Sequence, residues 1–126
     1  MGVAMAVAVQ AVDLAAVVAA VSIPVLAQHV DAIEYGASTG FMLPEAVKMA
    51  GAYGTLLNHS EHQIDLELLR ISIQRAREAG LFVVACAQDH EEAEKVMFME
   101  PDLVAVEPTE LIGGDVSVSN SKPEMI

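Results

Sequence analysis

Two side chains with acid–base chemistry, His59 and Glu107, each follow an apolar segment of the chain. His59 comes after Asn58 at the end of "GAYGTLL", and Glu107 ends the run "DLVAVE" and precedes a proline. A histidine can donate a hydrogen bond to a carbonyl, and a carboxylate beside apolar surface can act as a general base. His59 also has a simpler interpretation as the residue before a helix cap, and Glu107 as a solvated carboxylate at a strand end.

The residues that follow His59 bear on its role. Ser60 and Gln63 match the S-x-x-Q capping box, which predicts a helix that begins at Ser60. The positive end of that helix would point toward His59 and favour a neutral imidazole. A metal site would need His59, His62 and a third ligand, but nothing in the sequence completes a tetrahedral set.

The elements that must position these residues alternate along the chain. Apolar runs predict strands over 3–9, 23–28, 52–57, 81–87 and 102–107, and helical spacing or caps predict helices over 12–20, 43–51, 63–80 and 89–100. The 81–87 strand should be buried on both faces, and Asp89 should cap the last helix.

This alternation predicts an α/β fold with about five parallel strands and helical crossovers. An open doubly wound sheet and a (β/α) barrel both satisfy it, and no G-x-G-x-x-G follows the first strand. In either architecture chemistry takes place at the carboxyl ends of the strands. The polar residues expected there are Gln10, Gln28, His29, Asn58, His59, Gln88 and Glu107.

Composition narrows the classes of function. The 126 residues are enough for one domain, which we expect over residues 1–126, and 54% of them are hydrophobic with a mean hydropathy of +0.46. A net charge of -12 disfavours nucleic acid and anionic membranes as partners. A single cysteine fits a reducing compartment.

The apolar N-terminal segment could suggest a membrane span or a secretory signal. Gln10, Asp13, Ser22 and Pro24 interrupt it, so its clean apolar runs are too short to cross a bilayer. No lysine or arginine precedes it, as one would in a secretory signal. We therefore expect a buried strand and a helix here, and no membrane association.

Four stretches, "AQHVDAIEYGASTGFMLPEAVK", "LLNHSEH", "VAVEPTELIGG" and "VSVSNSKPEMI", carry a resemblance in the same order. Together they resemble the triosephosphate isomerase family in its archaeal form. The resemblance implies a partial (β/α)8 barrel covering strands two to six of eight. It implies an aldose–ketose isomerase of glycolysis and gluconeogenesis that interconverts dihydroxyacetone phosphate and glyceraldehyde 3-phosphate in the cytoplasm, without a metal or organic cofactor.

The resemblance also implies roles for single residues. His59 would be the electrophile and Glu107 the general base. Asn58, Ser60 and Glu61 would support the histidine. Thr39 would contact a neighbouring subunit, which implies a dimer or tetramer. The residues matching the lid over the substrate phosphate are Pro108, Ile112, Gly113 and Gly114.

The sequence also departs from the family pattern. The family's first strand, which carries its catalytic lysine, and its last two strands have no counterpart here. Lys48, Lys95 and Lys122 fall on predicted helices or the tail. Two alternatives therefore stay open: an inactive partial barrel that only associates, and an unrelated half-barrel that binds phosphate.

Overall fold

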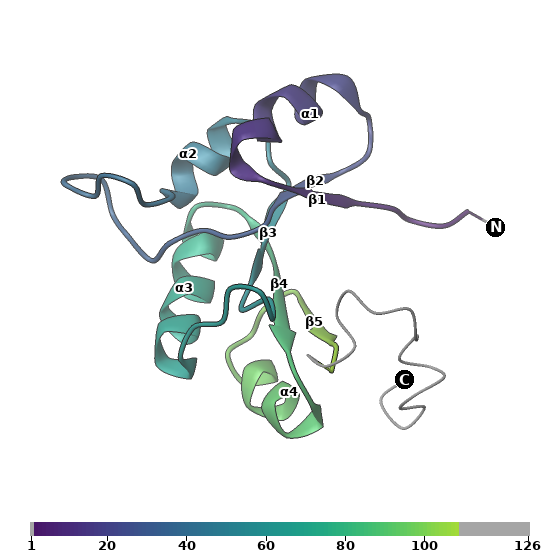
Figure 1. The fold of residues 1–126 in the computed structure, drawn as a ribbon, viewed down its shortest axis with the longest axis vertical. Coiled ribbons are helices and arrows are strands. Elements are labelled where there is room, and N and C mark those ends of the chain that lie inside the picture. The colour runs from purple at the N-terminus through teal and green to yellow at the C-terminus, as the bar shows by residue number, and fades with distance from the viewer. Residues whose placement is uncertain (1, 109–126) are drawn as a thin grey trace.

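The structure is a computed structural model that describes residues 2–108. Strands and helices alternate throughout this part of the chain (Figure 1). The strands are β1 (Val7–Val9), β2 (Val25–Ala27), β3 (Gly54–Leu57), β4 (Phe82–Ala87) and β5 (Leu103–Val106). The helices are the 3-10 helix η1 (Ala11–Asp13), α1 (Leu14–Ala20), α2 (Pro44–Met49), α3 (Leu66–Glu78) and α4 (His90–Met97).

The five strands form one parallel sheet in the order β1-β2-β3-β4-β5. Sheet order follows chain order with no reversal, so this sheet lacks the switch point of a doubly wound fold. Successive crossovers in one direction are the pattern of a (β/α) barrel. The structure thus decides between the two predicted architectures in favour of a partial barrel. Because all five strands are parallel, the carboxyl ends that precede the candidate residues face the same end of the sheet.

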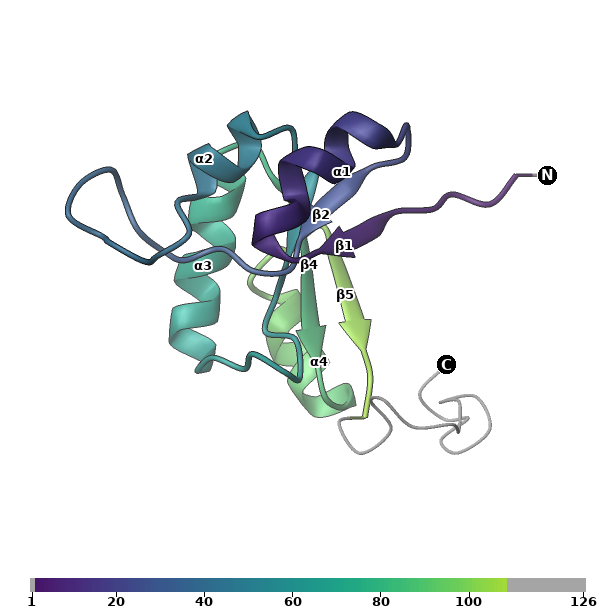
Figure 2. The same ribbon diagram turned by 45° about the horizontal axis from the view of Figure 1, so that its top comes forward.

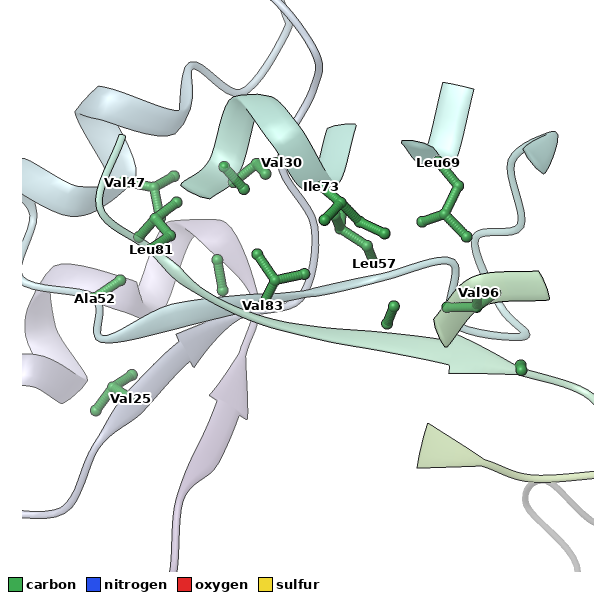
Figure 3. Packing of buried hydrophobic residues seen from close by; sticks show 14 of the residues in the cluster. Val25, Val30, Val47, Ala52, Leu57, Leu69, Ile73, Leu81, Val83 and Val96 are labelled. Atoms are coloured by element: carbon green, nitrogen blue, oxygen red, sulfur yellow. The ribbon is translucent and has the colours of Figure 1, made fainter. Parts of the chain in front are cut away.

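The core lies between the sheet and the helices that cover one of its faces (Figure 3). Val83 on β4, Leu69 and Ile73 on α3, and Val96 on α4 are at most 1% exposed. Along β4 the residues alternate between buried and half-buried. The prediction that this strand is buried on both faces was wrong, because helices pack on only one face within the described chain.

Side-chain caps set the helix starts. The Asp89 side chain accepts the Glu92 N–H of α4 at 2.8 Å, as predicted, and the Asp65 side chain accepts the Leu68 N–H of α3 at 2.8 Å. The helix predicted to begin at Ser60 therefore begins six residues later. Its N-terminus does not adjoin His59, so the predicted effect of its dipole on this histidine was wrong.

The first strand is shorter than the predicted 3–9. Its ladder begins where the Val7 N–H donates to the Pro24 carbonyl oxygen at 3.1 Å. Proline has no N–H to donate in return, so pairing does not extend toward the N-terminus. Residues 2–6 are exposed and belong to no strand.

A segment over residues 31–42 projects from the sheet between β2 and α2 (Figures 1 and 2). Arg75 of α3 ties down its base: Nη2 donates to the Ile33 carbonyl oxygen at 2.6 Å and to both Glu45 carboxylate oxygens, and Nε lies 3.1 Å from Glu34. Burial by itself lowers the pKa of Arg75, but Glu45 and Glu34 outweigh it and raise the pKa. This buried guanidinium fixes where the projecting segment leaves the domain.

Candidate active site

The carboxyl ends of β3, β4 and β5 surround a cavity of about 220 Å³. His59 and Glu107, the two acid–base candidates, both line it. The remaining lining residues are Leu56, Asn58, Ser60, Gln63, Val84, Cys86, Ala87, Gln88 and Ala105. The fold therefore brings together two side chains that are far apart in the sequence, against a mostly apolar wall.

His59 lies in a tight turn, where its ring is held by the backbone. The Glu61 N–H donates to His59 Nδ1 at 3.2 Å, and the His62 N–H donates to the His59 carbonyl oxygen at 2.8 Å. The Glu61 carboxylate is 3.7 Å from Nδ1, which is too long for a hydrogen bond. Because Nδ1 accepts a hydrogen bond from a backbone N–H, the neutral ring carries its own proton on Nε2. The histidine can thus present one N–H donor.

Asn58 allows the chain to turn directly before His59. It has a φ of 60°, which asparagine tolerates better than most residues, and it is only 4% exposed. Its side-chain Nδ2 donates to the Cys86 carbonyl oxygen at 3.0 Å, and its Oδ1 accepts the Ile64 N–H at 3.0 Å. Asn58 therefore links the end of β3 to β4 and to the segment that leads into α3.

Glu107 follows the last residue of β5. Its N–H donates to the Ala87 carbonyl oxygen at 3.1 Å, which extends the pairing of β4 and β5 by one residue. Pro108 is buried and restricts the glutamate backbone to extended conformations. The Glu107 side chain is exposed, while its backbone is anchored.

Cys86 lines the same cavity, and the sequence analysis did not select it. Burial, and to a smaller extent the charge of Glu107, raises the pKa of its thiol to about 11. The strand-end rule passes over Cys86 because it lies within β4. The period-two pattern that puts Val84 and Cys86 on one strand face is the signal that could have found it.

The other predicted site residues are placed differently. Ser60 lines the cavity, and its buried hydroxyl makes no hydrogen bond within the described chain. Glu61 contributes its backbone N–H to His59, while its side chain is exposed. Thr39 is exposed on the projecting segment, outside the residues that line the cavity. Ile112, Gly113 and Gly114, which were predicted to belong to a lid, lie outside the described residues.

Residues 2–108 form neither a metal-binding cluster nor a membrane-spanning helix. No three His, Cys, Asp or Glu side chains in this range come together in a way that could hold a metal ion. No helix in the same range is long and apolar enough to cross a membrane.

Comparison with known proteins gives a consistent result. A family model described as "Triosephosphate isomerase" matches residues 1–126. The chain is 44% identical over 117 residues to triosephosphate isomerase of Methanobacterium bryantii, covering 93% of this chain and 52% of that protein. It is 48% identical over 104 residues to that of Sulfurisphaera tokodaii, covering 82% of this chain and 45% of that protein.

A solved structure supports the fold alone. The triosephosphate isomerase of Bartonella henselae superposes with a TM-score of 0.66 at 22% identity, covering 82% of this chain and 54% of that one. The chain spans about half the length of the curated relatives it matches. With a family model matched along its whole length, the chain belongs to the triosephosphate isomerase family.

Proposed function

We propose that this chain supplies the proton-transfer half of a triosephosphate isomerase site, with His59 as electrophile and Glu107 as general base. The observation that carries the proposal is their shared cavity at the ends of β3 and β5, with Nδ1 of His59 already occupied by a backbone N–H. Neutral histidine paired with a glutamate base is the established arrangement of this enzyme, and it comes to this chain from the family.

The proposed reaction interconverts dihydroxyacetone phosphate and glyceraldehyde 3-phosphate. The Glu107 carboxylate removes a proton from the carbon next to the carbonyl, while His59 Nε2–H donates to the carbonyl oxygen as it gains negative charge. In the resulting enediolate, the hydroxyl proton on the neighbouring oxygen moves to the former carbonyl oxygen. Glu107 returns its proton to the former carbonyl carbon, and the neighbouring oxygen becomes the new carbonyl. A positioned general base contributes about 10²–10⁴-fold to such a step, and one donor to the developing oxyanion about 10²–10³-fold.

Substrate binding should be weak in this chain alone. Among residues 2–108, those that line the cavity include no lysine or arginine to meet the phosphate dianion. The whole chain carries a net charge of -12, which repels an anionic substrate at low ionic strength. Four residues match the lid, Pro108, Ile112, Gly113 and Gly114, and of these Gly113 would contribute its backbone N–H to the phosphate. We therefore expect activity to be limited by KM.

We further propose that the chain forms a homo-oligomer through the projecting segment 31–42. Tyr35 and Phe41 on this segment are 70% and 60% exposed, and they flank Thr39. Exposed aromatic side chains on a protruding segment are typical of protein contacts. Sedimentation of the parent chain and of a Tyr35→Ser/Phe41→Ser variant tests this, because the variant should sediment as a smaller species.

Association without catalysis is the second candidate function. Within residues 2–108, β1 and β5 are the edges of the sheet, and Leu103 at the start of β5 is 56% exposed. Exposed edge strands invite pairing with another chain. A chain that associates but shows no proton transfer would favour this candidate over the isomerase.

The direct test follows proton transfer rather than product. Dihydroxyacetone phosphate is incubated with the chain in D₂O, and NMR follows deuterium entering the carbon next to the carbonyl. The parent should promote exchange, and Glu107→Gln should lower the rate by about a hundredfold or more. His59→Gln should also lower it, whereas His90→Gln and Glu94→Gln, both on α4, serve as matched controls. Exchange at the buffer rate in the parent, or equal rates in Glu107→Gln and Glu94→Gln, would refute the assignment.

A further inference from the structure

A second cavity, of about 450 Å³, adjoins His59 on the side toward β2. His29, which follows β2, and His62, which closes the turn after β3, both line it. Their rings stack with centroids 3.9 Å apart and an interplanar angle of 25°. The proposed proton-transfer chemistry uses neither histidine, so this contact needs an explanation of its own.

His29 is held in a fixed orientation. Its Nε2 lies 3.0 Å from Asp31 Oδ1, and Asp31 Oδ2 accepts the Met42 N–H at 2.7 Å. The His29 side chain is only 14% exposed and that of Asp31 26%. The carboxylate thus connects the ring to the backbone at the far end of the projecting segment, and the ring offers a rigid surface to its neighbour.

His62 connects this surface to the proposed electrophile. Its backbone N–H donates to the His59 carbonyl oxygen, and the Glu61 N–H donates to His59 Nδ1. The turn lies outside α3, which begins only at Leu66. Asn58 holds the turn at its start through its bonds to Cys86 and Ile64, and the ring of His62 holds it at its end.

We propose that His29 and His62 are positioning residues that fix the turn carrying His59 and, with it, the tautomer of the His59 ring. The stack keeps the Glu61 N–H on Nδ1, so that the ring proton stays on Nε2, the atom that would donate to substrate. The importance of this tautomer for catalysis rests on the proposed function. The structural role of the stack does not rest on that function, because it concerns two hydrogen bonds to His59 in the chain without substrate.

The test compares His62→Ala with His62→Phe in the full 126-residue chain. Both remove the imidazole, but only His62→Phe keeps a ring that can stack on His29. The readouts are hydrogen exchange of the amides at positions 61 and 62, which bond to His59, and the ¹⁵N shifts of the His59 ring, which report its tautomer. The Leu69 amide, bonded to the Asp65 carbonyl oxygen in α3, is the internal reference.

In His62→Ala we expect the two turn amides to exchange about twofold to tenfold faster, the range that a stacked aromatic pair accounts for. The Nδ1–H tautomer of His59 should become populated, and His62→Phe should restore both readouts. Unchanged exchange in His62→Ala, or equal behaviour of His62→Phe and His62→Ala, would overturn the proposal.

Faster exchange at Leu69 in parallel with the turn would also overturn it, since the stack would then support the whole fold. Should His62→Ala fail to fold, Asp31→Asn takes its place. This substitution loosens the hold on His29 without removing either ring. It must speed the exchange of the same two amides and raise the population of the same His59 tautomer. These readouts require no turnover. A chain without isomerase activity would therefore refute the proposed function, while the amide exchange and the His59 tautomer would still test this inference.

Discussion

Replacing Asn58 by alanine should be among the most damaging single changes to this chain. The side chain makes two hydrogen bonds of 3.0 Å, one to the Cys86 carbonyl oxygen and one from the Ile64 N–H, in a position that is 4% exposed. Alanine removes both partners and leaves a backbone carbonyl and a backbone N–H without them. It also places a residue with a Cβ and no local hydrogen bonding at a φ of 60°.

The size of the expected loss of stability follows from these two effects. Each buried backbone group left without a partner costs about 1–3 kcal/mol, so the two lost bonds together should cost about 2–6 kcal/mol. The left-handed backbone adds roughly 1 kcal/mol for alanine. Asn58→Gly loses the same bonds but tolerates the positive φ, so it is the matched control and should lie between the parent and Asn58→Ala.

Urea denaturation measures the difference in the free energy of unfolding between the parent and these variants. For a slope of about 1–3 kcal/mol per M, the midpoint of Asn58→Ala should fall by on the order of 1 M or more, with the slope unchanged. A midpoint within about 0.3 M of the parent, a shift too small for the loss of even one buried partner, would refute the claim that these bonds hold the end of β3. Equal midpoints for alanine and glycine would refute the backbone contribution.

Three further changes test other features of the structure. Arg75→Lys cannot keep the contacts to Glu45 and the projecting segment, so the free energy of unfolding measured in urea should fall by about 2–4 kcal/mol. Proteases should also cut within 31–42 sooner, and unchanged cleavage would contradict this. Because the pKa of Cys86 is raised from 9.0 to about 11, its thiolate fraction at pH 8 should be about a hundredfold lower than in the unfolded chain, and iodoacetamide should react correspondingly slowly. Glu107→Gln removes the charge that contributes to this shift and should speed the reaction; an unchanged rate would show that Glu107 does not face the thiol. Gly54→Ala would bring its Cβ into collision with the Phe82 carbonyl oxygen of β4, so it should destabilise the sheet by about 1–3 kcal/mol in the same urea assay.

The raised pKa of Cys86 also has a consequence for stability against pH. A folded-state pKa above the unfolded value favours the protonated thiol in the folded chain. The associated stability is fully present below pH 9 and is lost as the pH rises toward about 11. Cys86→Ala should flatten this decline, as measured by thermal unfolding at several pH values.

Several features that depend on neighbours in the sequence were predicted correctly, and one was not. Asp89 caps α4 as expected, because an N-cap needs only the first turn of its own helix. The five strands follow from short apolar runs with breaks between them, and the strand-end rule selected both His59 and Glu107. The capping box at Ser60 failed, because Asn58 binds the Ile64 N–H and leads the chain through a turn before Asp65 caps α3.

The sequence by itself determined the alternation of elements and which polar residues follow each strand, because both are local properties of chain direction and hydrophobic pattern. The tertiary structure alone decided the barrel-type strand order, the stack of His29 on His62, and the attachment of Arg75 to the base of the projecting segment. These contacts join elements whose spacing depends on strand register and helix packing. A side chain at a strand end has many neighbours within reach, and only the packed sheet selects the one it meets.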